Sequence, residues 1–341
     1  MESTALICHE DQHFSLEPVL LPDAGPRQMV VRTRYSGISI GTEFALVRNK
    51  ISWGPYPLCT GYQAVGIVER VGEDVRGFQP GDKVYYRDNK VMQFPDGRAV
   101  SAVAGTHCRH AVIDPDNTHG VALLPDGVSE DVASLFVMPA VGLYGVDMAN
   151  PRMGDTVVVY GAGLIGLGVV AACAHRGCVV VAVDLDERRL ALARDLGADH
   201  VVNAATHDPV DEIKKIVPPL AEGSGLADVV FESTGIPECI DRAIALCKPL
   251  GKFVWQGNYG EKPVSVRFLP AHGRRLTMFF PCDDGLAPCR RAVLKNMAMG
   301  ALKWERTITH RVEFSQAPEL FDRINKNSAP DVVGAVIRWS D

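Results

Sequence analysis

The chain has 341 residues, of which 47% are apolar and 22% are charged, and it carries a formal net charge of −6 with a pI near 5.9. This length exceeds that of a usual single domain, and the apolar content is ample for two hydrophobic cores. Because the balance is mildly acidic and contains no basic run, we expect neither nucleic acid nor an anionic membrane surface as a partner. The composition indicates a soluble protein of two domains.

The N-terminus and the cysteines favour a cytoplasmic location. The first ten residues lack a basic region followed by an apolar one, so we expect no export signal. The longest apolar stretches, 157–174 and 135–146, are interrupted by Gly, Pro, His or Arg, and they fit buried strands and helices better than a membrane span. The nine cysteines form no CxxC pair, which suggests free thiols in a reducing compartment.

The first part of the chain, to about residue 126, is predicted to consist of short β-strands. β-Branched and aromatic residues fill these segments, and turns rich in Gly, Pro and Asp separate them. The pattern predicts a twisted, barrel-like β unit. Its predicted strands are 29–35, 66–71, 83–86 and 110–113.

From about residue 130 the apolar period changes to that of helices, and Ser129 is the predicted cap of a helix over 130–137. Strands and helices then alternate, which predicts a doubly wound parallel sheet and an α/β fold. The predicted strands are 157–160, 178–184, 200–202, 229–232 and 252–256, and the helices between them are 167–175, 188–196, 210–217 and 237–247. The remaining predicted elements are the helices 289–299 and 317–325, the segment 307–314 and the last strand 334–339.

The most specific motif is a glycine pattern that follows the strand over 157–160. The first glycine permits a tight turn, the second lets the backbone approach a pyrophosphate, and the third lets the next helix pack on the sheet. The phosphates then lie at the positive end of that helix. The pattern predicts a dinucleotide cofactor, and its predicted contacts are Gly161, Gly163, Leu164, Ile165 and Gly166.

The next strand ends in an acid that indicates which dinucleotide binds. Asp184 lies about twenty residues past the glycines, where a carboxylate can accept hydrogen bonds from both ribose hydroxyls and would repel a 2′-phosphate. The residues 185–187 contain no arginine cluster, so we predict NAD as the cofactor rather than NADP. Arg188 and Arg189 keep NADP open, because either could pair with a 2′-phosphate.

Two later strand ends should also meet the cofactor, because ligands of parallel sheets bind beyond the carboxyl ends of the strands. Thr234 and Gly235 follow the strand 229–232 and are predicted to lie near a ribose. Gln256 and Gly257 follow the next strand, and their backbone is predicted to meet the nicotinamide amide.

Taken together, the motifs resemble the medium-chain dehydrogenase/reductase family, which has the zinc-type alcohol dehydrogenase fold. The resemblance implies a GroES-like β-barrel catalytic domain over 1–139, a Rossmann NAD-binding domain over 140–280 and a C-terminal return to the catalytic domain over 281–341. It also implies a homodimer that pairs through an edge strand at 274–280. The matching segments, in family order, are 61–72, 78–84, 154–166, 197–203, 228–235 and 333–337.

The chain departs from this family at the positions that hold the catalytic zinc. Ser39 or Ile40 takes the place of the cysteine, Tyr62 that of the histidine, Gln63 that of the glutamate and Met138 that of the third ligand. Zinc binds thiolate, imidazole or carboxylate, so none of these side chains is a normal ligand and we predict no zinc.

The same requirement for ligands applies to two other possible metal sites. The lobe that holds a structural zinc in many relatives offers only Cys108 here, so that site is also predicted to be absent. The alternative is a novel site built from Cys59, His107, Cys108 or His110. We favour the simpler interpretation, in which the histidines are hydrogen-bonded residues of the β domain and the cysteines are buried.

Without a metal ion, hydrogen-bond donors must stabilise the substrate oxygen. Tyr62 is the leading candidate, because the resemblance places this position beside the nicotinamide and a phenol can donate a hydrogen bond and exchange a proton. The alternative is that Tyr62 fills the space that the zinc would occupy. The resemblance implies that Thr42 relays the substrate proton, and Ser39 and Gln63 are predicted to add donors.

Residues around this predicted site have supporting roles. Glu43 is predicted to be a structural partner for an arginine or a backbone amide. The predicted apolar wall for the substrate comprises Met138 and Trp53 or Tyr56.

These observations predict an NAD(H)-dependent, zinc-independent oxidoreductase that interconverts an alcohol and a carbonyl of a small-molecule substrate. The segment 36–43 resembles a subgroup that includes bacteriochlorophyllide-type dehydrogenases, which favours alcohol chemistry slightly. One alternative is a metal-free ene or quinone reductase, and another is a non-catalytic nucleotide-binding redox sensor. The sequence does not identify the substrate or the physiological direction.

Overall fold

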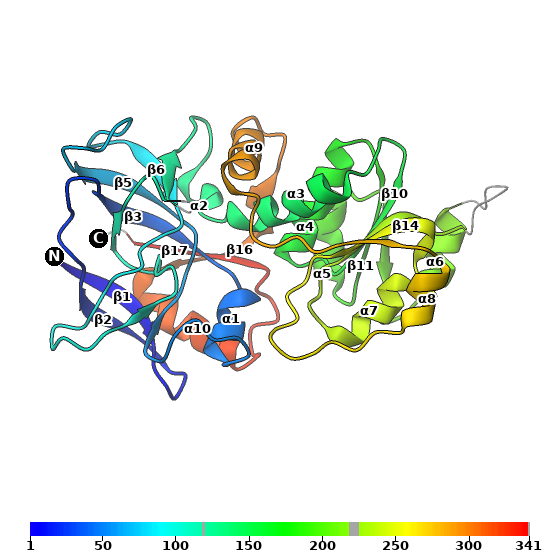
Figure 1. Ribbon diagram of the computed structural model, residues 1–341, viewed down its shortest axis with the longest axis horizontal. Coiled ribbons are helices and arrows are strands. Elements are labelled where there is room, and N and C mark those ends of the chain that lie inside the picture. Colours follow the sequence, from blue (N-terminus) through cyan, green and yellow to red (C-terminus); the bar gives the residue numbers. More distant parts are fainter. Residues whose placement is uncertain (118–119, 218–224, 340–341) are drawn as a thin grey trace. The chain divides into compact units, whose positions relative to one another are not determined.

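The computed structural model describes residues 1–117, 120–217 and 225–339 (Figure 1). Within the described chain no helix is long and apolar enough to cross a membrane. The chain forms two compact units. Unit 1 comprises Met1–Phe136, Leu294–Ala301 and Ile308–Asp341, and unit 2 comprises Val137–Val293 and Leu302–Thr307.

Unit 1 is a β-structure, as predicted for the GroES-like part. Its larger sheet has seven strands in the order β16-β17-β3-β5-β6-β9, with β8 paired to β3. All four strands predicted in this part of the chain occur in it. The strands are β3 (Met29–Ile38), β5 (Ala64–Val71), β6 (Lys83–Tyr86), β8 (His110–Ile113), β9 (Val121–Leu123), β16 (Ile308–Glu313) and β17 (Gly334–Arg338).

Strand β3 organises this sheet and leads directly to the candidate site. It pairs with β5, β8 and β17, and the register against β5 shifts between Val30 and Val31 and again between Thr33 and Tyr35. Such bulges bend a strand and increase its twist, which lets one strand serve several neighbours. Ser39 is the first residue after β3, and the short helix α1 (Thr42–Val47) follows it.

The second sheet of unit 1 was not predicted. It has the strand order β2-β1-β4-β7, and two of its strands contain only two residues each. Such short strands carry no periodic pattern, and the two longer ones alternate polar and apolar residues only partly. The strands are β1 (Glu2–Cys8), β2 (Phe14–Leu20), β4 (Leu58–Cys59) and β7 (Ser101–Ala102).

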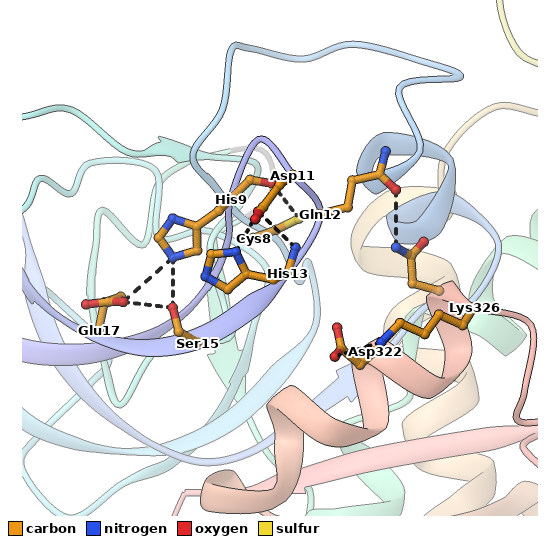
Figure 2. A network of polar contacts seen from close by, with 10 residues as sticks. Cys8, His9, Asp11, Gln12, His13, Ser15, Glu17, Asp322 and Lys326 are labelled. Atoms are coloured by element: carbon orange, nitrogen blue, oxygen red, sulfur yellow. Dashed lines mark hydrogen bonds and ion pairs between the residues drawn. The ribbon is translucent and has the colours of Figure 1, made fainter.

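The turn between β1 and β2 carries a polar network (Figure 2). The rings of His9 and His13 stack with their centroids 4.2 Å apart, and each ring has its own acid. His9 Nε2 lies 3.6 Å from a carboxylate oxygen of Glu17. His13 Nδ1 lies 2.5 Å from Oδ1 of Asp11, and hydrogen bonds from the side chain and backbone of His13 lower the pKa of the Asp11 carboxyl. Because His9 contacts Ser15 and Glu17 of β2 while His13 contacts Asp11 of the turn, the network ties the turn to the hairpin.

Unit 2 contains the predicted doubly wound parallel sheet. All six strands are parallel, in the order β12-β11-β10-β13-β14-β15. Val158 faces the cluster that contains Ile240, whereas Val159 faces the opposite side, where its side chain lies near Gly166. The strands are β10 (Thr156–Tyr160), β11 (Val179–Asp184), β12 (His200–Asn203), β13 (Ala227–Glu232), β14 (Cys247–Trp255) and β15 (Thr277–Phe279).

The helices follow the predicted alternation closely. The helices that connect the strands of unit 2 begin and end within a few residues of the predicted bounds. Two other helices of unit 2, α3 and α8, were not predicted, and neither was α1 of unit 1. The helices are α3 (Val137–Ala149), α4 (Leu164–His175), α5 (Glu187–Asp195), α6 (Pro209–Ile216), α7 (Pro237–Ile244), α8 (Phe268–Gly273), α9 (Leu286–Ala298) and α10 (Ala317–Asn325).

The predicted helix over 130–137 is wrong as a single element. Helix α2 (Glu130–Ala133) stops after one turn, and α3 starts afresh at Val137. The Ser134 hydroxyl donates to the carbonyl of Asp131 at 2.7 Å, which competes with continuation of the helix. Ser129 is the N-cap residue, as predicted, but its side chain makes no hydrogen bond to the helix amides.

The predicted edge strand over 274–280 is shorter than expected. Only Thr277–Phe279 forms β15, which pairs with β14 and lies at the end of the sheet. Residue 274 instead follows α8 as its C-cap, and Arg275 has a φ of 54°, which turns the chain before the strand can start.

Candidate functional site

The glycine loop of unit 2 has the geometry that a dinucleotide requires. Gly161 has a φ of +102°, a conformation that other residues rarely adopt. A Cβ on Gly166 would lie 1.9 Å from the Gly161 carbonyl oxygen, so only glycine allows α4 to approach β10. A Cβ on Gly163, by contrast, would have no heavy atom of the described residues within 4 Å. The fold requires two of these glycines, and the third leaves open space in front of the loop.

Helix α4 begins at this open space. Its N-cap is Gly163, in an extended conformation, and no described side chain caps the helix. The amides of Leu164 and Ile165 therefore lie in a first turn that has neither a cap nor an acidic residue. Free amides and the positive end of the helix dipole favour an anion at this position.

Asp184 lies at the end of β11 and fixes the glycine loop. Its carboxylate accepts hydrogen bonds from the backbone N–H groups of Ala162, at 2.7 Å, and Leu185, at 2.8 Å. Arg189 Nη1 lies 4.0 Å from this carboxylate, while Arg188 pairs with Asp186 at 2.8 Å. The predicted ribose acid is therefore held beside the loop with its negative charge only partly balanced.

A buried acid that was not predicted as a site residue joins the two other loops that are predicted to contact the cofactor. Glu232 accepts hydrogen bonds from the Thr234 amide, at 3.0 Å, from the Thr234 hydroxyl and from the Tyr259 hydroxyl. Its backbone carbonyl accepts from the amides of Gln256, at 2.9 Å, and Gly257, at 2.8 Å. Burial raises the pKa of the Glu232 carboxyl, and the hydrogen bonds from Thr234 and Tyr259 oppose the rise.

The role of Glu232 could have been predicted from its place in the sequence, at the end of a strand of the parallel sheet. An acid at the last residue of a central parallel strand is buried, so it needs several donors from the loops around it. The open Gly163 loop, the uncapped helix and these fixed loops together fit a dinucleotide.

In unit 1 the structure brings three predicted catalytic residues together. The Tyr62 phenol donates a hydrogen bond to Ser39 Oγ at 2.5 Å, and it also hydrogen-bonds with the Thr42 side chain. The Arg87 guanidinium carbon lies 5.4 Å from the centre of the Tyr62 ring, and Arg87 Nε donates to the Tyr62 carbonyl at 3.1 Å. This arrangement, which we call the hydroxyl cluster, consists of Ser39, Thr42 and Tyr62.

The phenol of the hydroxyl cluster is a neutral donor. Burial raises the pKa of Tyr62 to about 12, and the hydrogen bonds with Ser39 and Thr42 only partly oppose the rise. Its side chain is 8% exposed. A neutral phenol in a desolvated site can stabilise charge that develops on a nearby oxygen.

The other predicted site residues have different surroundings. Gln63 is fully buried, and its backbone carbonyl accepts from the Gly37 amide at 3.0 Å. Tyr56 donates its hydroxyl to the Val47 carbonyl at 2.6 Å, which ties the preceding loop to α1. Trp53 is 58% exposed, and Met138 is buried in α3 of unit 2.

The donor set of unit 1 does not fit zinc. Ser39 Oγ already accepts the Tyr62 proton. Burial raises the pKa of the Cys59 and Cys108 thiols, so neither readily supplies a thiolate. His107 bonds to Ser36 and Glu43 through its two ring nitrogens. Across residues 1–117, 120–217 and 225–339, no three His, Cys, Asp or Glu side chains form a group that could hold a metal ion.

Comparison with known proteins gives two matching family models. The alcohol dehydrogenase GroES-like domain matches residues 25–126, and the zinc-binding dehydrogenase model matches residues 165–297. An alcohol dehydrogenase of Cupriavidus necator is 27% identical over 93% of this chain and 94% of its own length. A sorbitol dehydrogenase of Ovis aries is 27% identical over 95% of this chain and 94% of its own length.

The fold is also found in a solved structure. A zinc-binding dehydrogenase of Sinorhizobium meliloti, described as putative and bound to NADP, has a TM-score of 0.82 and 24% identity, with 99% of both chains covered. Neither matching family model includes Met138, and the model named for zinc binding also excludes the positions of the hydroxyl cluster.

Proposed function

The chain belongs to the medium-chain dehydrogenase/reductase family and is an oxidoreductase, and from this premise we propose that it interconverts an alcohol and a carbonyl with NAD(H) and without zinc. Relatives named alcohol dehydrogenase and sorbitol dehydrogenase support alcohol chemistry. The observation that carries the metal-free part is the hydroxyl cluster, in which Tyr62 donates to Ser39 at the positions where the family resemblance places zinc ligands.

NAD, when bound, supplies the acceptor or donor of a hydride. Gly161, Gly163 and Gly166 would hold its pyrophosphate at the start of α4, and Asp184 would hold a ribose. The loops that Glu232 joins would contact the rest of the cofactor through Thr234, Gln256 and Gly257.

The hydroxyl cluster would act on the substrate oxygen. When an alcohol is oxidised, its carbon loses a hydride and its oxygen loses a proton. We propose that Tyr62 donates a hydrogen bond to that oxygen, and that the Thr42 and Ser39 hydroxyls relay the proton to solvent, each accepting one proton as it gives up its own. Gln63 is proposed as a further hydrogen-bond donor. Each well-placed donor is worth about 3 kcal/mol to the transition state when water is excluded.

Asp184 should determine the choice of cofactor. We expect Asp184→Asn to lower the preference for NAD over NADP by about tenfold, or about 1.4 kcal/mol, because the negative charge that repels a 2′-phosphate is lost. The measurement is the ratio of kcat/KM for the two cofactors. Asp199→Asn is the matched control, since Asp199 also accepts a backbone amide, that of Val180 at 2.8 Å, at a distance from the loop. An unchanged ratio in Asp184→Asn, or a parent protein that prefers NADP, would contradict this assignment.

The same cluster supports a second candidate reaction. An ene or quinone reductase leaves an enolate or phenolate oxygen, which a neutral phenol can stabilise without a metal ion. A neutral Tyr62 therefore serves either reaction, and the nature of the substrate must distinguish them.

A cofactor-consumption screen tests the proposal. The panel comprises sugars, polyols, secondary alcohols, enones and quinones, each with NAD(H) and NADP(H). Turnover of an alcohol or its ketone supports the proposal. Turnover of enones or quinones alone would replace it with the reductase, and stable NAD binding without any turnover would replace it with a redox sensor.

We also propose the domain division 1–139, 140–280 and 281–341, a cytoplasmic location and a homodimer. Strand β15 supports the dimer, because it ends the sheet of unit 2. Phe268, Leu269 and Phe280 near it in the chain are 68%, 75% and 66% exposed. An open strand edge with exposed apolar residues favours pairing with a second copy.

A further inference from the structure

A buried pair, the Glu43 carboxylate and the His107 ring, is joined to the hydroxyl cluster. Glu43 Oε2 lies 2.8 Å from His107 Nε2, and the two side chains are 1% and 0% exposed. Burying a carboxylate is costly unless several donors satisfy it, so each contact of this pair needs an explanation.

The Glu43 carboxylate receives three donors. Its Oε1 accepts from the Ser39 amide at 2.7 Å. Its Oε2 accepts from the Thr60 hydroxyl at 2.7 Å and contacts His107 Nε2 at 2.8 Å. Both oxygens are thus satisfied, and the donors come from three separate segments of the chain.

His107 continues the network to the C-terminal strand. Its Nδ1 lies 2.8 Å from Ser36 Oγ, which accepts a hydrogen bond from Trp339 Nε1 at 2.8 Å. With Ser36 donating to Nδ1 and the ring carrying its proton on Nε2, each donor in the chain from Trp339 through Ser36 and His107 to Glu43 has an acceptor. The rings of His107 and Phe321 also pack nearly perpendicular to each other, with their centres 5.4 Å apart.

The Glu43 carboxylate therefore accepts hydrogen bonds from both segments that form the hydroxyl cluster, the one with Ser39 and the one with Tyr62. Ser39 is held directly through its amide, and Thr60 lies two residues before Tyr62. Thr42 precedes Glu43 in α1. In a site without a bound ion to fix its side chains, this connection can set the distance between the phenol and its partners.

We propose that Glu43 and His107 are positioning residues, which hold Ser39 and Tyr62 at hydrogen-bonding distance so that the phenol is aimed at the substrate. This inference rests on the proposed function, because Tyr62 must act on the substrate for its position to affect the rate. A solely structural pair would stabilise unit 1 without fixing Tyr62. The two roles differ in what happens when the pair is replaced by apolar side chains.

The test uses Glu43→Leu/His107→Phe, since replacing both members of a buried polar pair by apolar side chains leaves neither partner unpaired and can keep the protein folded. The full chain is labelled with 3-fluorotyrosine and studied by ¹⁹F NMR without cofactor or substrate, and Tyr62→Phe identifies the resonance. We expect the Tyr62 resonance to broaden or move toward those of exposed tyrosines. We also expect kcat to fall by about tenfold to a hundredfold, with a smaller change in KM.

Two variants serve as controls. Glu43→Gln keeps an acceptor for the Ser39 amide, and His107 can reverse its tautomer, so the resonance and kcat should stay near the parent values. Thr33→Val removes two buried hydrogen bonds of unit 1 that do not involve Glu43 or the His107 ring, one with Tyr86 Oη at 2.7 Å and one to the Cys108 carbonyl at 2.5 Å. It should lower the melting temperature without changing the Tyr62 resonance.

If the apolar pair prevents folding, Thr60→Val removes one of the three donors with little change of shape and takes its place in the same measurements. A folded pair variant that keeps the parent Tyr62 resonance would overturn the proposal. A changed resonance with unchanged turnover would confirm the positioning of Tyr62 but refute the role of Tyr62 in the proposed function.

Discussion

Replacing Tyr62 by phenylalanine should lower kcat by about a hundredfold to a thousandfold, while affinity for NAD stays at the parent value. The variant removes only the phenol oxygen, which donates to Ser39 in the free protein and would donate to the substrate oxygen in the complex. Steady-state kinetics and cofactor titration give the two quantities separately.

Tyr86→Phe is the matched control for this variant. Its phenol is also buried in unit 1, where it bonds to Thr33 at 2.7 Å. The control should lose stability but keep kcat. Unaltered turnover in Tyr62→Phe would contradict a catalytic role and would show that Tyr62 only fills space.

The pH dependence should agree with a neutral phenol. Burial raises the pKa of Tyr62 to about 12, against the effects of Ser39, Thr42 and the Arg87 guanidinium, and with a contribution from the Glu43 carboxylate. A donor with a raised pKa stays protonated through neutral pH and is lost only as the pH rises toward that value. We therefore expect no titration of Tyr62 in the kcat profile from about pH 6 to 9.

Gly163→Ala should fold like the parent protein and bind NAD at least about tenfold more weakly. Gly163 has a φ of −71°, which alanine adopts easily, and the new Cβ would meet no heavy atom of the described chain within 4 Å. The methyl group therefore costs little in the free protein, but it occupies the open space that we assign to the pyrophosphate. Thermal melting and cofactor titration measure the two effects.

Two other glycine variants serve as controls for Gly163→Ala. Gly273→Ala, whose Cβ likewise has open space in the part of the chain that is described, should change neither property. Gly166→Ala should lower the melting temperature, because its Cβ would lie 1.9 Å from the Gly161 carbonyl oxygen. Parent-like NAD affinity in Gly163→Ala would contradict the placement of the pyrophosphate.

The cofactor half of the protein could be predicted from sequence because its signals are local. The glycines and Asp184 lie within one βαβ unit, so their spacing alone predicts how they meet. The β1–β2 hairpin was missed for the opposite reason. Its two strands alternate polar and apolar residues only partly, and the turn between them is fixed by contacts such as those of His9 and His13.

The connections that hold the candidate site together could not be predicted, because they join residues far apart in the chain. Glu43 was expected to bond to an arginine or a backbone amide. It does accept an amide, that of Ser39, but its second oxygen contacts the ring of His107, which lies 64 residues away. His107 is a hydrogen-bonded histidine of the β domain, as predicted. No periodic pattern encodes the choice of partner, which depends on how β3, β4 and β8 pack.

The central claim is that the hydroxyl cluster replaces a metal ion, and elemental analysis combined with kinetics tests it most directly. The purified protein is analysed for zinc, dialysed against a chelator and assayed with the substrate that the screen identifies. We predict that zinc is well below stoichiometric and that kcat is unchanged by the chelator. A stoichiometric zinc whose removal abolishes turnover, and whose return restores it, would contradict this account.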